Sequence, residues 1–152
     1  MIRVVKEIIV SAPVDVVFEY VANFENNVLW IVSVTEIFDL TPPEPGVGQS
    51  YSWTYSLAGI PFKGNSVVTE FEPNKRLVYE TMGGINSTWT YLLTAENGKT
   101  HFQLQVDYIM PLRALSKLAE PFLRRMNERE TDLSLQNLKE LIEQTERIAV
   151  PT

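Results

Sequence analysis

Hydrophobic and polar positions follow two different periods along the chain, and each change of period marks a predicted element. Residues 2–10 are rich in β-branched side chains, which favours a strand. The next apolar positions have the i, i+3, i+4, i+7 spacing of a helix and are Val14, Val17, Phe18 and Val21. Ser11 is the expected N-cap of this helix, Pro13 fits its first turn, and Asn23 marks its end. The chain is therefore predicted to begin with a strand and a short amphipathic helix.

Strands separated by turns are predicted for most of the remaining chain, after a second helical turn within residues 24–30. The expected strands are 32–40, 50–57, 62–72, 77–82, 87–94 and 100–110. Residues 41–48 contain three prolines and two glycines, which exclude regular structure, and residues 59–61 are expected to form a turn. The pair Asn97-Gly98 predicts a tight hairpin. Short connections of this kind indicate an antiparallel sheet.

The clearest alternation lies in residues 50–57, where one strand face is aromatic or apolar and the other is hydroxylic. The first face holds Tyr51, Trp53, Tyr55 and Leu57, and the second holds Ser50, Ser52, Thr54 and Ser56. Such a period of two predicts a strand with one face against the interior and one face toward solvent.

A helical period returns at residue 112 and continues almost to the end of the chain. Pro121 is expected to break or kink this segment, leaving residues 112–120 as one piece and a long helix from Phe122 to about Arg147. The arc predicted to face the sheet holds Phe122, Leu123, Met126, Leu133, Leu138 and Leu141. The same arc also carries Asn127, Glu130, Thr131, Ser134 and Asn137.

The polar residues on this arc have two interpretations, because burying an unpaired polar group costs ~1–3 kcal/mol. In the first, the helix is rotated so that these residues lie at the edge of the contact and reach water, with Glu130 paired to an arginine. In the second, the middle of the helix roofs a cavity, and Glu130 with Asn127 or Ser134 supplies the few polar contacts of a ligand site. The second interpretation would also give Glu130 a role in acid–base chemistry.

Composition and charge exclude several classes of function. The chain has 152 residues, taken as one domain, and its net charge of −6 argues against a nucleic-acid partner. It has no cysteine and a single histidine, so no disulfide, zinc site or redox-metal site is expected, and no cofactor is predicted. No apolar run reaches the roughly 18 residues of a membrane span, and residues 1–10 lack a signal-peptide core, so a cytoplasmic location is expected.

Few residues outside the predicted cavity indicate chemistry. His101 shares a strand face with Gln103, Gln105 and Asp107, which predicts a histidine at the surface. Six strand positions separate His101 from Asp107 by roughly 20 Å, too far for a catalytic triad. Residues 46–48 and 83–84 are expected to be turns, because their glycines match no nucleotide-binding fingerprint.

Five phrases along the chain resemble the START-like, or SRPBCC, superfamily, and particularly its polyketide cyclase/dehydrase-type branch. In order, they are SAPVDVVF at 11–18, FEN at 24–26 with Trp30, PGVG at 45–48, VTEFEP at 68–73 before Arg76-Leu77, and TWTY at 88–91. The resemblance implies an α+β helix-grip fold with two short helices after the first strand. In this fold a curved, seven-stranded antiparallel sheet wraps a long C-terminal helix around a hydrophobic cavity. It transfers no catalytic residue, because the catalytic members of the superfamily share no portable motif.

The expected function is binding or transport of a hydrophobic small molecule, lipid-like or of the polycyclic aromatic or polyketide kind. The residues predicted to line its cavity are Trp30, Tyr51, Trp53, Tyr55, Tyr79, Trp89, Tyr91, Phe102, Leu104, Tyr108, Phe122, Met126, Asn127, Glu130 and Ser134. One alternative is an aromatase/cyclase or dehydratase that holds a reactive polyketide. Another is an accessory module that binds a partner protein and has no natural ligand.

Overall fold

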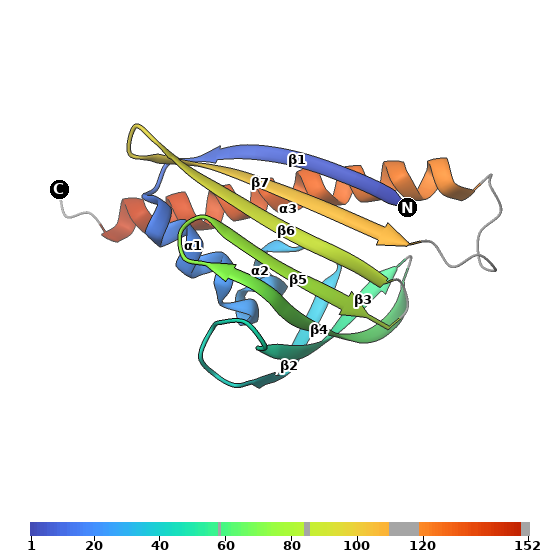
Figure 1. Ribbon diagram of the computed structural model, residues 1–152. Helices are drawn as coiled ribbons and strands as arrows, with labels where there is room; N and C mark the ends of the chain where they lie inside the picture. The colour runs from blue at the N-terminus through green and yellow to red at the C-terminus, as the bar shows by residue number, and fades with distance from the viewer. Residues whose placement is uncertain (58, 84–85, 110–118, 150–152) are drawn as a thin grey trace.

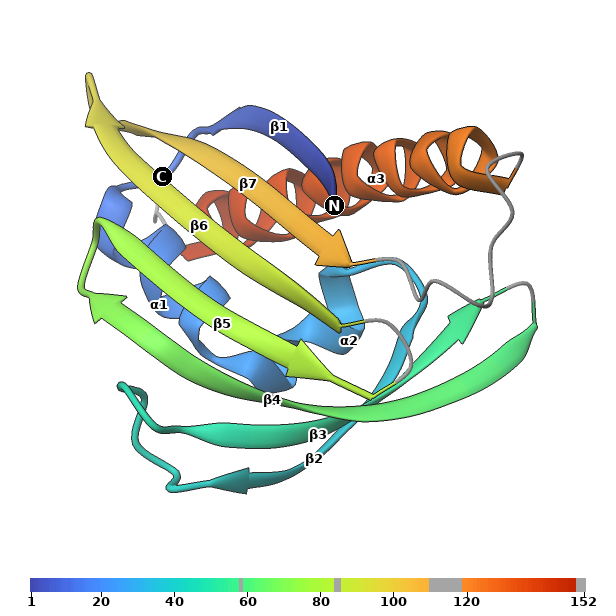
Figure 2. The ribbon, with the colours of Figure 1, turned by 45° about the vertical axis from the view of Figure 1, so that its right-hand side comes forward.

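One antiparallel sheet and one long helix dominate the computed structural model, which describes residues 1–57, 59–83, 86–109 and 119–149 (Figure 1). The strands are β1 (Ile2–Val10), β2 (Val34–Thr41), β3 (Ser50–Leu57), β4 (Ile60–Glu72), β5 (Arg76–Met82), β6 (Asn86–Glu96) and β7 (Lys99–Ile109). The helices are α1 (Val14–Ala22), η1 (Phe24–Asn26), α2 (Asn27–Trp30) and α3 (Ala119–Ala149). The sheet curves around α3 and the short helices, as Figure 2 shows, so the predicted helix-grip fold is confirmed.

The sheet has the strand order β1-β7-β6-β5-β4-β3-β2, in which every strand from β2 to β6 pairs with the next one in sequence. β1 pairs with β7 from Ile2 opposite Tyr108 to Val10 opposite Thr100, which brings the two ends of the sheet-forming chain together. The predicted hairpin is confirmed, because Asn97 and Gly98 both have positive φ and Glu96 pairs with Lys99.

The N-terminal helix begins later than the sequence predicts. Pro13 occupies the N-cap position of α1, so the prediction of Ser11 as N-cap was wrong. The backbone N–H of Ser11 instead donates to Glu143 Oε2 of α3 at 2.9 Å. Ser11, just after β1, thus makes a tertiary contact with α3, which propensity alone does not reveal.

β4 begins earlier than predicted, because Ile60 and Pro61 belong to the strand rather than to the turn. Ile60 pairs with Leu57 and Pro61 with Ser56 of β3. β5 pairs with β4 only from Asn65 onward, so the first residues of β4 lie at a sheet edge. Proline is tolerated at an edge because its missing N–H would have no partner there.

The long helix runs through Pro121 instead of breaking there. Pro121 lies in the first turn of α3, where backbone N–H groups have no intrahelical partner. A proline at this position therefore removes no hydrogen bond of the helix. The predicted separate segment at 112–120 lies almost wholly outside the described residues. None of the described helices has the length and hydropathy needed to cross a bilayer.

The face that α3 turns inward differs from the predicted arc. Leu135, Leu138 and Ile142 are buried, whereas Leu133 is 47% exposed and Phe122 is 68% exposed. The predictions for Leu133 and Phe122 were therefore wrong. The buried face includes Thr131 and Ser134, and Ser134 accepts a hydrogen bond from the backbone of Val32, so this face makes polar contacts as well as apolar ones. Summing hydrophobicity around the helix cannot detect such contacts.

Candidate ligand-binding site

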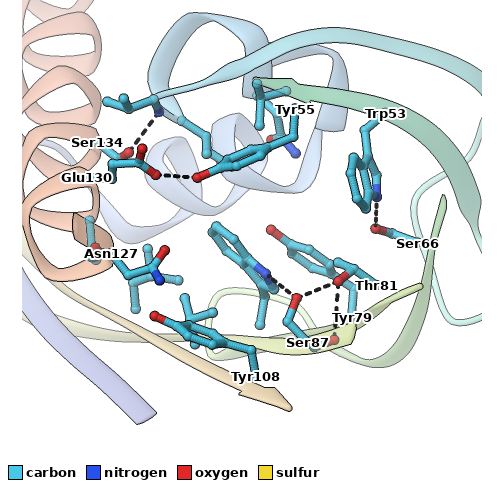
Figure 3. Close-up of a pocket in the computed structure, with 18 of the residues that line it drawn as sticks. Trp53, Tyr55, Ser66, Tyr79, Thr81, Ser87, Tyr108, Asn127, Glu130 and Ser134 are labelled. Atoms are coloured by element: carbon cyan, nitrogen blue, oxygen red, sulfur yellow. Dashed lines mark hydrogen bonds between the residues drawn. The ribbon is translucent and has the colours of Figure 1, made fainter. Parts of the chain in front are cut away.

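A cavity of about 380 Å³ lies between the concave face of the sheet and the first half of α3 (Figure 3). Its volume is within the ~300–1,000 Å³ typical of small-molecule sites. Strands contribute mainly aromatic and aliphatic side chains, and α3 contributes a roof that includes Met126, Asn127 and Glu130. The interior therefore combines a large apolar surface with a few polar groups.

Most residues predicted for the cavity do line it. These are Tyr51, Trp53, Tyr55, Tyr79, Trp89, Leu104, Tyr108, Met126, Asn127, Glu130 and Ser134. They come from different strands and from α3, and strand alternation brings their side chains to one face.

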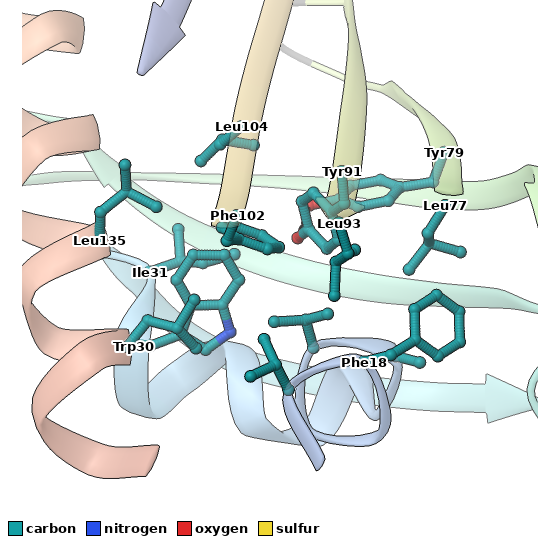
Figure 4. Packing of buried hydrophobic residues seen from close by; sticks show 14 of the residues in the cluster. Phe18, Trp30, Ile31, Leu77, Tyr79, Tyr91, Leu93, Phe102, Leu104 and Leu135 are labelled. Carbon is teal, nitrogen blue, oxygen red and sulfur yellow. Dashed lines mark hydrogen bonds between the residues drawn. The ribbon is translucent and has the colours of Figure 1, made fainter. Parts of the chain in front are cut away.

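Trp30, Tyr91, Phe102 and Phe122 are placed elsewhere. The first three are fully buried and pack together, with ring centroids 5.9 Å apart for Trp30–Tyr91 and 5.4 Å for Tyr91–Phe102 (Figure 4). Alternation shows which strand residues point inward, but it does not show whether they meet packed side chains or open space. The short helices fill one end of the sheet and form a solid core there. Phe122 points outward because of the rotation of α3.

Sequence reasoning missed several polar residues of the cavity wall. Ser66, Thr81 and Ser87 line it, and so does Asn27 from α2. The three hydroxyl residues could have been found by alternation, because each lies two positions from an inward-facing neighbour on its strand. Asn27 had no such signal, since a single turn of helix has no readable period.

The middle of α3 is held over the cavity by hydrogen bonds. Tyr55 Oη donates to Glu130 Oε2, and Ser33 Oγ donates to Glu130 Oε1 at 3.2 Å. One turn further along, Ser134 Oγ accepts a hydrogen bond from the backbone N–H of Val32 at 2.9 Å. Glu130 thus lines the cavity and, within the described part of the chain, pairs with hydroxyl groups and with no arginine. Of the two interpretations of this helix face, the geometry matches the cavity roof.

Two indole groups of the wall have hydrogen-bond partners within the protein. Trp53 Nε1 donates to Ser66 Oγ at 3.0 Å, and Trp89 Nε1 donates to Ser87 Oγ at 3.0 Å. The Ser87 hydroxyl also shares a hydrogen bond with Thr81 Oγ1. The rings are thereby held in fixed orientations, with Trp89 stacked on Tyr79 at a centroid distance of 5.8 Å. The wall is a pre-formed aromatic surface.

The tyrosines of the site are strongly biased toward the neutral phenol. Burial raises the pKa of Tyr51, Tyr79 and Tyr108 above the ordinary value. Burial also raises the pKa of Tyr55, and the hydrogen bond to Glu130 and the charge of that carboxylate add to the increase. These phenols are hydrogen-bonding groups at neutral pH and not sources of phenolate.

His101 lies away from the cavity. Its Nε2 is 3.2 Å from Glu7 Oε2 of the neighbouring strand β1. Among the described residues, no group of three or more histidine or carboxylate side chains is arranged to hold a metal ion.

Comparisons with known proteins agree on family and fold. A profile of the family described as "Polyketide cyclase / dehydrase and lipid transport" matches residues 1–143. A search of curated protein sequences found no match. The Zhui aromatase/cyclase from Streptomyces sp. R1128 superposes with a TM-score of 0.81 at 17% identity, covering 99% of both chains.

Other solved structures share the same architecture. A START superfamily protein from Mycobacterium smegmatis gives a TM-score of 0.77 at 15% identity, over 94% of this chain and 98% of the other. TTHA0849 from Thermus thermophilus gives a TM-score of 0.80 at 15% identity, covering 93% of this chain and 97% of the other. At these identities the superpositions demonstrate a shared fold, and the profile match demonstrates descent. The chain therefore belongs to the family described as polyketide cyclase/dehydrase and lipid transport.

Proposed function

We propose that the protein binds a hydrophobic small molecule, lipid-like or polycyclic aromatic, in the cavity between the sheet and α3. The observation that carries this proposal is the aromatic wall of the 380 Å³ cavity, formed by residues that contact one another but leave the centre open. Removing apolar surface from water contributes about 25 cal/mol per Å², so a ligand that buries about 300 Å² gains about 7 kcal/mol before the costs of association. The described strand residues that line the cavity carry no charge, so an apolar ligand would desolvate no ionised group along the strands.

A second candidate function is that of an aromatase/cyclase acting on a polyketide-like substrate. It is favoured by the carboxylate of Glu130, which lies in the cavity within hydrogen-bonding reach of the hydroxyls of Tyr55 and Ser33. The carboxylate could remove a proton next to a ketone, and the neighbouring hydroxyls could then donate hydrogen bonds to the resulting enolate oxygen. The similarity in fold to an aromatase/cyclase is consistent with this role.

Tryptophan fluorescence tests the binding proposal directly. Trp53 and Trp89 line the cavity, whereas Trp30 lies in the packed core. Anthracene-sized aromatics and 1-dodecanol should alter the emission of the wild type and of Trp30→Phe. Variants in which Trp53 or Trp89 is replaced by Phe should lose part of the change. If none of these probes changes the emission, and native mass spectrometry of freshly purified protein shows no retained small molecule, the proposal is wrong.

The enzymatic alternative requires a separate measurement. Incubation with a short linear poly-β-ketone thioester should give a cyclised product with the wild type and much less with Glu130→Gln. Binding of this thioester without any acceleration of cyclisation would leave the carrier function and eliminate the enzymatic one.

A further inference from the structure

We propose that the cavity selects uncharged ligands that donate a hydrogen bond, and that Glu130 excludes ligands carrying a carboxylate. This inference rests on the proposed function, because it requires that the cavity bind a small molecule. It divides the candidate ligands by charge: fatty acids and aromatic acids are rejected, whereas alcohols and phenols of the same size are accepted.

Glu130 is the one charged side chain among the described residues that line the cavity. Its carboxylate accepts hydrogen bonds from the uncharged hydroxyls of Tyr55 and Ser33. Among the ion pairs of the described residues, none joins a basic side chain to Glu130. Arg124, whose charge reaches Tyr108, is exposed and does not line the cavity. No basic side chain of the described residues therefore neutralises the negative charge of Glu130 inside the site.

A ligand carboxylate would bring a second negative charge into the same apolar space. Like charges repel more strongly in such surroundings than in water, because the effective dielectric constant is lower. The acid must then bind weakly or take up a proton on binding. An alcohol of the same shape meets no such repulsion.

Four hydrogen-bond donors of the cavity wall are already used within the protein. Trp53 and Trp89 donate to serines, Asn127 Nδ2 donates to Leu123 O at 2.9 Å, and Thr131 Oγ1 donates to Asn127 O at 2.7 Å. A ligand that offers only acceptors thus finds few donors among these groups.

Several acceptors, in contrast, have no protein partner or are only partly used. A carboxylate has about four lone-pair positions, and Glu130 uses two of them for Tyr55 and Ser33. Asn27 lines the cavity at 2% exposure, and its Oδ1 has no hydrogen-bond partner in the described structure. Tyr108 is 5% exposed, and its buried hydroxyl, which can either donate or accept, is likewise unpaired there. A ligand hydroxyl matches this surplus of acceptors, and burying it without a partner would be costly.

A set of matched probes tests the inference. Dissociation constants of 2-naphthol, 2-naphthamide and 2-naphthoate are measured by tryptophan fluorescence at neutral pH, and 1-dodecanol and dodecanoate form a parallel acyl pair. The wild type should bind each uncharged probe more tightly than its anionic counterpart by about tenfold or more. Glu130→Gln retains an acceptor for Tyr55 but removes the charge. It should therefore abolish this difference in affinity, mainly by binding the anionic probes more tightly.

Glu140→Gln serves as the control, because Glu140 is an exposed carboxylate on the same helix and does not line the cavity. It changes the net charge equally and should leave the preference of the wild type intact. Equal affinity for acids and alcohols in the wild type, or a gap that survives in Glu130→Gln, would overturn the inference while leaving the proposed function standing. Failure of every probe to bind either protein would refute the proposed function itself, and the inference with it.

Discussion

The hydroxyl of Tyr55 on β3 donates a hydrogen bond to the carboxylate of Glu130 on α3, joining the sheet to the helix at the edge of the cavity. Beside it, Ser33 and the backbone of Val32 make further hydrogen bonds to the same stretch of helix. The middle of α3 is thus positioned by polar contacts, while Leu135, Leu138 and Ile142 are buried in the next two turns. A helix held in this way can cover an open space without collapsing onto it.

Tyr55→Phe should lower the stability of the fold. The substitution removes a hydrogen bond to a charged group, which is worth about 1.5–3 kcal/mol, and leaves the carboxylate with one protein donor fewer. For a chain of this length the melting temperature falls by about 2–4 °C for each kcal/mol. Differential scanning calorimetry at neutral pH measures the effect.

Tyr20→Phe is the matched control for this prediction. The hydroxyl of Tyr20 is buried but has no hydrogen-bond partner among the described residues. Its removal deletes no hydrogen bond, so the melting temperature should stay the same or rise slightly. Equal losses in the two variants would show that the Tyr55–Glu130 contact adds nothing to stability.

Alkaline pH should unfold the protein cooperatively. The pKa of every one of the six tyrosines is raised, chiefly by burial. Above the unfolded value of about 10, the folded state therefore retains protons that the unfolded state has released. This contribution to stability is fully present below pH ~10 and is lost as the pH rises beyond it.

Ultraviolet absorbance of phenolate, followed together with circular dichroism, checks this behaviour. In the native protein, absorbance should lag behind a normal tyrosine titration and then rise together with the loss of secondary structure. The same chain in concentrated guanidinium chloride should titrate near pH ~10. Full, reversible tyrosine ionisation near that pH in a chain that stays folded would contradict the prediction.

Gly64→Ala should disturb the wall of the cavity. A Cβ at this position of β4 would lie 2.4 Å from the carbonyl oxygen of Met82 and 2.4 Å from Cζ2 of Trp53. The carbonyl belongs to the backbone and cannot move aside, so Trp53 or the strand itself must shift. Overpacking of this kind costs about 1–3 kcal/mol, and near-ultraviolet circular dichroism should report the displaced indole.

Asn65→Ala provides the comparison for the Gly64 variant. Asn65 is the next residue of the same strand and is exposed, so its truncation should change the free energy of unfolding by less than about 0.5 kcal/mol. If Gly64→Ala were as stable as Asn65→Ala, with an unchanged tryptophan spectrum, close contact at Gly64 would not constrain Trp53.

Local patterns in the sequence were sufficient to predict most of the strands. The alternation in residues 50–57 predicts both β3 and its aromatic face, and Asn97-Gly98 predicts the β6–β7 hairpin. These features depend on side-chain period and on backbone conformations available to particular residues, which neighbours in sequence determine. The same reasoning placed Trp53, Tyr55 and Trp89 on the face that lines the cavity.

Only the tertiary structure decided which inward-facing residues meet open space. Tyr91 and Trp89 are both on β6, yet Tyr91 packs in the core and Trp89 lines the cavity, because the short helices cover only one end of the sheet. The rotation of α3 was also beyond sequence reasoning. It involves hydrogen bonds to Glu130 from Tyr55 and Ser33, which precede it in the chain by 75 and 97 positions. The hydrophobic period of the sequence determines which side of a helix or strand is apolar. Contacts between elements that are distant in sequence determine what that side packs against.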